Sequence, residues 1–210
     1  MDKTSMIRRR NLLLLGVMLS GGMMLAGCQQ TLTKMGLPGG EKPADRVGYT
    51  CCNLHHEGDW ISDSNYAELP MIAVGAPAKV TGYGRNYASV DVDGKPMRLG
   101  LDYGREQQTL QEFVDKIVVT EDPKKKLATF PASVQDAIGQ GKVMVGMTRE
   151  QVIMAVGYPM ANETTSLDED LWRYWISSFG PYQVLWDGKG RVKEIAADQL
   201  TYNIIAYRPK

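Results

Sequence analysis

The sequence has few of the residues that most often carry catalysis by nucleophile or general base: its 210 residues include two histidines and three cysteines. The histidines are neighbours, His55 and His56, so catalysis by histidine would be confined to one short stretch. The chain also lacks an excess of positive charge, because 24 basic groups balance 24 acidic ones. This balance argues against a nucleic-acid partner. No Ser-His-Asp pattern, pair of carboxylates or phosphate-cradling glycine loop stands out. The composition favours a binding or structural protein over an enzyme.

The first feature that is present is a secretory signal. A basic group of residues at 3–10 precedes an apolar stretch at 12–27, which is shorter than the ~20 residues of a membrane-spanning helix. The stretch ends in Leu25-Ala26-Gly27-Cys28, which resembles the bacterial lipobox. The resemblance implies that residues 1–27 are a lipoprotein signal peptide and that Cys28 receives acyl chains, such as palmitate. Two or three such chains anchor a protein stably in a bilayer, so we expect this covalent lipid and no other cofactor.

The residues that follow Cys28 suggest a destination and a tether. Gln29 stands where an aspartate commonly retains lipoproteins in the inner membrane, which implies the periplasmic face of the outer membrane. Residues 28–46 are interrupted by glycine and proline and show no apolar periodicity. They are typical of a flexible tether that holds a folded part away from the membrane.

A second group of residues with chemical potential is Cys51, Cys52, His55 and His56. Two thiolates and two imidazoles are ligands that Zn or Cu prefer, which makes these residues a candidate metal site. Their spacing matches no established zinc pattern. A disulfide between the two cysteines is the second reading, although adjacent Cα atoms lie about 3.8 Å apart, below the usual ~4.4–6.8 Å range. The third reading is a pair of inert thiols or pairing with another chain.

The middle of the chain, residues 47–122, is predicted to form a small β-rich module, with a five-stranded SH3-like roll as one candidate. Short β-favouring pieces alternate there with turn residues, and Asp93-Gly94 is a strong hairpin dipeptide. The expected strands cover residues 71–74, 78–83, 87–92 and 95–101. Apolar residues at helical spacing then predict a helix over 109–119.

Residues 123–130 contain a run of three lysines and are predicted to be a linker to a second domain, 131–210. There we expect a short helix over 131–138 and a second helix after Thr148. Thr148 and Gln151 have the spacing of a capping box, and Gly157 supplies a stop. Three antiparallel strands are predicted over 171–177, 182–187 and 191–195. The expected fold class is therefore α+β, with a two-layer helix-helix-sheet unit at its C-terminal end.

This C-terminal pattern resembles the SmpA/OmlA (BamE-like) family of small outer-membrane lipoproteins. The matching residues are Gly146-Met147-Thr148-x-x-Gln151-Val152, Gly157-Tyr158-Pro159, Trp172-x-Tyr174, Val184-x-Trp186-Asp187 and Gly190-x-Val192. The resemblance covers roughly residues 131–197 and implies the helix-helix-sheet fold and a scaffold role in β-barrel assembly. No partner-binding residue is carried over from it.

One strand face is a candidate binding surface. Alternation over 171–177 directs Trp172 and Tyr174 to the core and leaves Leu171, Arg173 and Trp175 on the opposite face. An aromatic ring beside a guanidinium is a composition enriched at interaction hot spots. The expected partners are the outer-membrane bilayer and a protein of envelope or barrel assembly. Two alternatives stay open: an envelope ligand-binding or inhibitor module, with the β-rich module touching peptidoglycan, and a thiol or metal protein.

Overall fold

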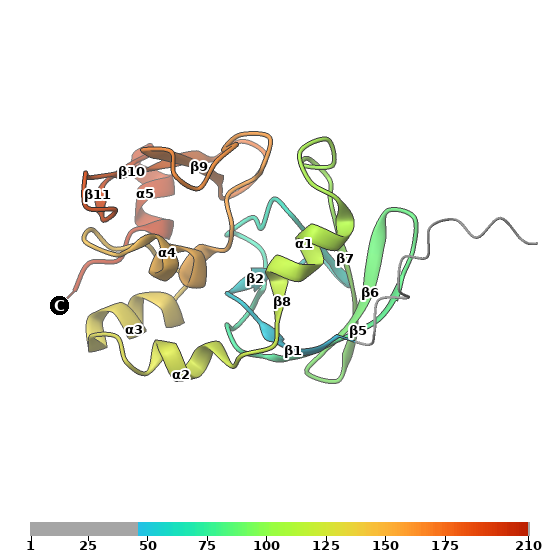
Figure 1. Ribbon diagram of the computed structural model, residues 1–210. Helices are drawn as coiled ribbons and strands as arrows, with labels where there is room; N and C mark the ends of the chain where they lie inside the picture. Colours follow the sequence, from blue (N-terminus) through green and yellow to red (C-terminus); the bar gives the residue numbers. More distant parts are fainter. Residues whose placement is uncertain (1–45, 210) are drawn as a thin grey trace, which may run out of the picture. The chain divides into compact units, whose positions relative to one another are not determined.

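The computed structural model describes residues 46–209, which form a mixed α+β fold (Figure 1). Their buried apolar residues form two hydrophobic cores. The predicted signal peptide, the predicted lipidation site Cys28 and almost all of the predicted tether lie outside the described residues. Strands and helices follow in chain order as β1 Val47–Thr50, β2 Leu54–His55, β3 Trp60–Ser62, β4 Met71–Ile72, β5 Pro77–Tyr83, β6 Tyr87–Val92, β7 Lys95–Gly100, α1 Leu110–Ile117, β8 Val118–Val119, α2 Pro123–Leu127, α3 Ala132–Gly139, α4 Arg149–Val156, β9 Leu171–Trp175, β10 Pro181–Trp186, β11 Val192–Ala196 and α5 Gln199–Ile205.

The first half of the described chain forms a curled six-stranded sheet with the order β3-β7-β6-β5-β1-β8 (Figure 1). The predicted hairpin is confirmed, since Asp93 and Gly94 both have positive φ, +52° and +77°, and join β6 to β7. Pro96 has no backbone N–H to donate to a neighbouring strand. It lies before Arg98, where the parallel pairing of β3 with β7 begins, so no hydrogen bond to β3 is lost at Pro96. The sheet has six strands, one more than the SH3-like candidate.

Helix α1 covers the inner face of this sheet. Thr109 caps the helix by accepting from Glu112 N, and the Glu112 carboxylate accepts from Thr109 N at 2.7 Å. The helix predicted over 109–119 is present as Leu110–Ile117, whereas Val118 and Val119 form strand β8, which pairs with β1. Phe113, Val114 and Ile117 point into a core that also contains the apolar residues of β5, β6 and β7.

The C-terminal part contains the expected antiparallel sheet, in the order β11-β10-β9. Helices α3, α4 and α5 pack their apolar residues against one face of it (Figure 1). The predicted capping box of α4 is confirmed, because Gln151 N donates to Thr148 Oγ1 while Gln151 Oε1 accepts from Thr148 N at 2.8 Å. Trp172 and Tyr174, which were predicted to pack in the core, are at most 5% exposed, and so are Val184 and Trp186 of the neighbouring strand β10.

Two helices occur where none was predicted. Helix α2 lies inside the predicted linker 123–130, with Asp122 accepting from Lys124 N at 2.9 Å and Pro123 in the first turn. Helix α5 follows the last strand, and Asp198 caps it. Both caps are aspartates that directly precede the first helical residue, a signal that is present in the sequence.

Candidate functional site

The predicted binding face is the outer face of the C-terminal sheet. In β9 Leu171 and Trp175 are half-buried and Arg173 is exposed, while the two residues between them are buried. The register of β10 places Leu185, Gln183 and Pro181 directly opposite Leu171, Arg173 and Trp175. Residues opposite one another in an antiparallel pair share a face. We call these six residues the outer sheet face, and its two ends are apolar rows, Leu171–Leu185 and Trp175–Pro181.

The charge on this face is only partly neutralised. Arg173 Nη1 lies 3.5 Å from Glu163 Oε2, and the arginine side chain is 54% exposed. An exposed pair at this distance contributes little to stability, so the guanidinium remains available to a partner. The backbone N–H of Arg173 donates to Thr164 Oγ1 at 3.0 Å, so the segment that carries Glu163 and Thr164 protects the free edge of β9.

An exposed aromatic ring stands beside the outer sheet face, although it is not the one that was predicted. Trp175 is half-buried, whereas Phe179, in the turn between β9 and β10, is 95% exposed. Phe179 was missed because it belongs to no strand and has no alternation to place it. The signal that could have found it is an aromatic residue between Ser178 and Gly180, in a turn where polar residues are usual.

The buried face of the sheet, opposite the outer sheet face, carries a layer of packed aromatic rings from β9 and β10. The Trp172 and Trp186 rings meet edge to face at 4.6 Å between centroids, and the Arg149 guanidinium lies 5.2 Å from the Trp186 centroid. Tyr174 and Tyr182 stack at 5.3 Å. Burial raises the pKa of both tyrosine hydroxyls, so both stay neutral. This packing fixes the strands that display the outer sheet face.

The cysteines and histidines of the second predicted site do not form one ligand set. Cys51 and Cys52 are joined in a disulfide and are at most 8% exposed. His55 Nδ1 lies 2.7 Å from Leu69 O, and His56 Nδ1 lies 2.8 Å from Gly58 O. Within residues 46–209 no three or more His, Cys, Asp or Glu side chains converge on a point that could hold a metal ion. The metal hypothesis would require the disulfide to be reduced, because only thiolates coordinate metals well.

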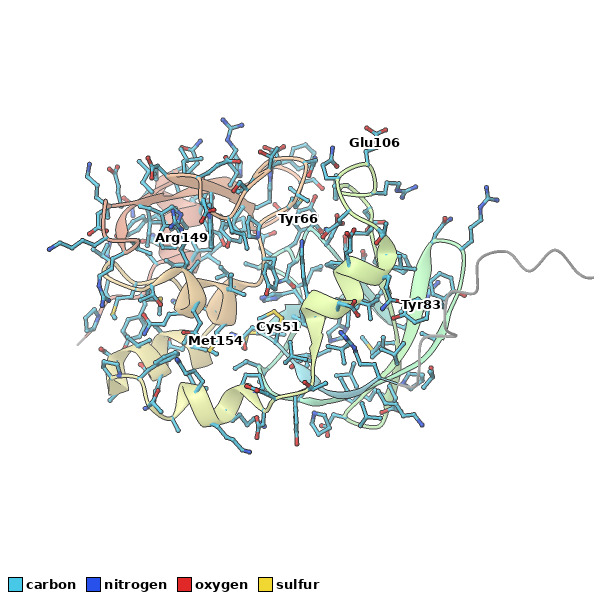
Figure 2. All side chains as sticks on the ribbon, viewed as in Figure 1. Cys51, Tyr66, Tyr83, Glu106, Arg149 and Met154 are labelled. Carbon is cyan, nitrogen blue, oxygen red and sulfur yellow. A yellow bond between two sulfur atoms is a disulfide. The ribbon has the colours of Figure 1, made fainter. Side chains whose placement is uncertain are left out.

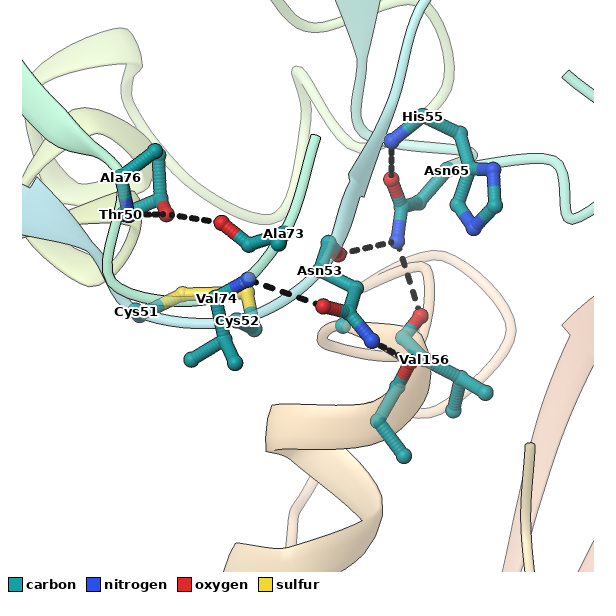
Figure 3. The surroundings of a disulfide bond; sticks show 12 residues. Thr50, Cys51, Cys52, Asn53, His55, Asn65, Ala73, Val74, Ala76 and Val156 are labelled. Carbon is teal, nitrogen blue, oxygen red and sulfur yellow. Dashed lines mark hydrogen bonds between the residues drawn. A yellow bond between two sulfur atoms is a disulfide. The ribbon is translucent and has the colours of Figure 1, made fainter. Parts of the chain in front are cut away.

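The disulfide lies in a segment that connects the two cores. Its neighbour Asn53 is fully buried, and its Nδ2 donates to Ile138 O at 2.6 Å and to Ala155 O at 2.9 Å, while its Oδ1 accepts from Val74 N at 2.8 Å (Figure 3). Cys51 N donates to Ile117 O at 2.8 Å. These bonds hold residues 51–53 against α1, α3 and α4, which is a structural role for the segment.

No family model, curated protein or solved structure matches this chain. Within residues 46–209 no helix has the length and apolar character needed to cross a membrane.

Proposed function

We propose that this chain is a lipid-anchored outer-membrane lipoprotein without enzymatic activity that binds a protein partner during envelope or β-barrel assembly. The observation that carries the proposal is the outer sheet face, where an exposed guanidinium lies between two apolar rows and the exposed Phe179 follows in the turn after β9. The anchor is the predicted lipid on Cys28, and the predicted location is the periplasmic face of the outer membrane.

The order of the C-terminal elements supports this proposal. Two helices followed by three antiparallel strands is the order that the SmpA/OmlA (BamE-like) resemblance implies. The residues that carry the resemblance have clear structural roles, such as the cap at Thr148 and the positive φ of Gly157. We infer a BamE-like arrangement of this unit and, with it, a scaffold role.

The chemistry of the outer sheet face suits a protein partner. Leu171 and Trp175 offer apolar surface that is already held in place, so little conformational entropy is lost when a partner covers it. Arg173 adds a planar group that can bond a carboxylate in two places. Arginine and aromatic residues at the centre of an interface typically contribute most of its binding energy.

The test is a mild cross-linking pull-down of the lipidated chain from detergent-solubilised outer membranes. We expect recovery of barrel-assembly or other envelope-assembly proteins, and loss of that recovery with Cys28→Ala, which removes the anchor. Arg173→Ala should lower the recovery, whereas Arg105→Ala, an exposed arginine far from the outer sheet face in the chain, should not. If Trp175→Ala and Arg173→Ala, both folded by circular dichroism, retain full recovery, the outer sheet face is not the binding surface.

A second candidate function is an envelope ligand-binding module. The observation that favours it is a small cavity in the N-terminal part of the described chain, beside the buried His55.

A further inference from the structure

A cavity of about 190 Å³ opens beside the buried His55. It lies within the N-terminal half of the described chain, and no residue of the outer sheet face lines it. The lining is mostly polar and aromatic, with Glu57, Trp60, Ser62, Ser64, Tyr66, Asp102 and Tyr103 among its residues. Its volume fits a small molecule or the end of a longer one.

The imidazole of His55 has one nitrogen without a partner. Nδ1 lies 2.7 Å from the carbonyl oxygen of Leu69, and a carbonyl can only accept, so Nδ1 must carry the proton. The other nitrogen, Nε2, is then an acceptor, and it has no hydrogen-bond partner. The residue is only 5% exposed. Figure 3 shows the ring turned away from the disulfide, on the side of Asn65. Because buried polar atoms are nearly always bonded, a free buried acceptor calls for a donor from outside the chain.

The charges that line the cavity are negative. Glu57 and Asp102 are both exposed carboxylates, and no lysine or arginine belongs to the lining. Glu57 has no ion-pair or hydrogen-bond partner for its side chain within residues 46–209, whereas Asp102 Oδ2 accepts from Trp60 Nε1 at 2.9 Å. The Arg98 guanidinium lies 5.3 Å from the centroid of the Trp60 ring, and the Asp59 carboxylate already pairs with it through two bonds of 2.7 and 2.6 Å. The lining therefore favours a cation and disfavours phosphate or a carboxylate.

Aromatic rings form the rest of the wall. Trp60 is half-buried, and the Tyr66 and Tyr103 hydroxyls lie 2.8 Å apart. Tyr66 is labelled in Figure 2. Ring faces attract a nearby positive charge and pack against the methylene groups attached to it.

We propose that this cavity binds a small soluble ligand through a protonated primary amine. One N–H of the ammonium donates to His55 Nε2, the carboxylates of Glu57 and Asp102 supply the opposite charge, and the rings of Trp60 and Tyr66 enclose the alkyl chain. An ammonium offers only donors, and the groups available for bonding in the cavity are mainly acceptors. A sugar would add acceptors of its own, for which the lining offers fewer donors. This binding does not depend on the partner that the outer sheet face takes.

The probe is cadaverine, with pentane-1,5-diol as its uncharged match. Because His55 and His56 are the only histidines of the chain, ¹⁵N-histidine labelling of the full lipidated protein in detergent micelles gives two assignable imidazoles. We expect cadaverine to shift the Nε2 signal of His55 in a saturable way and to leave that of His56 nearly unchanged. The diol should produce no comparable shift at equal concentration. Equal shifts with both compounds would indicate a polyol or sugar site and overturn the proposal.

Variants separate a specific site from a general attraction of the cation to the surface. Glu57→Gln removes one charge from an exposed position, so it should fold normally and weaken cadaverine binding by about fivefold or more. Glu68→Gln removes the same charge from an exposed position outside the lining and should leave binding unchanged. His55→Phe should abolish binding. If Glu57→Gln binds cadaverine as tightly as the unaltered chain, or if Glu68→Gln weakens binding equally, no amine site exists here.

Discussion

Asn65 donates from its side-chain amide to the main-chain oxygen of Asn53 at 3.1 Å, and the two asparagines together bond the last carbonyl groups of helix α4. Asn53 N and Nδ2 donate to Met154 O and Ala155 O, and Asn65 Nδ2 donates to Val156 O at 2.8 Å. The last carbonyls of a helix have no partner within it, so both side chains satisfy groups that would otherwise be buried without bonds. Residues more than 85 positions apart thereby become one folded unit.

Replacing Asn53 by alanine should lower the free energy of unfolding by about 2–4 kcal/mol, because it leaves buried polar groups of Ile138, Ala155 and Val74 without partners. Urea unfolding followed by circular dichroism measures the change. Asn203→Ala, which removes an exposed amide from α5, is the matched control and should cost less than about 0.5 kcal/mol. An equal, small loss in both variants would show that Asn53 does not hold the two cores together.

These long-range bonds mark the limit of prediction from this sequence. The Thr148 cap and the Asp93-Gly94 turn were predictable because each depends on residues within three or four positions. The inward positions of Trp172 and Tyr174 followed from simple alternation. The role of Asn53 was not predictable, since its partners lie at positions 74, 138 and 155 and no local pattern connects them. The parallel pairing of β3 with β7 was missed for the same reason.

The candidate binding residues divide in the same way. Alternation correctly placed Leu171, Arg173 and Trp175 together on one face of the strand, opposite the core. It did not predict that Trp175 is half-buried or that Phe179 is the exposed ring, because exposure depends on the turn and on neighbouring segments. The cavity beside His55 combines residues from positions 55 to 103, so spacing along the chain carries no signal for it.

The buried disulfide between Cys51 and Cys52 leads to a prediction about thiol reactivity. In the native chain we expect no thiol to react with iodoacetamide, because the proposed lipid would block Cys28 and the other two sulfurs are bonded and covered. After unfolding and reduction, two thiols should react. Mass spectrometry counts the added groups. Two reactive thiols in the native, unreduced protein would instead revive the inert-thiol and metal readings of this segment.

Stability should depend on pH through His55. Burial lowers its pKa below the usual 6.5, so the unfolded chain binds the proton more readily than the folded one. The free energy of unfolding should therefore fall as the pH decreases below about 6.5 and level off below the lowered pKa. Urea unfolding between pH 7.5 and 5 measures this slope, and carboxylates, which titrate at lower pH, contribute little in that window. His55→Phe, if it folds, should flatten the dependence, and an unchanged slope in this variant would assign the effect to another group.

The exposed ring of Phe179 separates binding from stability more cleanly than any core residue does. Phe179→Ser removes a side chain that is 95% exposed, so unfolding should change by less than about 0.5 kcal/mol. If the outer sheet face binds a protein, the same change should weaken capture of that partner, since losing an aromatic anchor commonly costs about 2 kcal/mol, or roughly thirtyfold in affinity. Leu200→Ser is the control, because Leu200 is also largely exposed, at 77%, but lies on α5. A loss of capture confined to Phe179→Ser would place the partner on the β9–β10 side of the sheet. Equal losses in both variants would show that capture reflects nonspecific binding by exposed apolar side chains. Unchanged capture in both would show that the interface does not include Phe179.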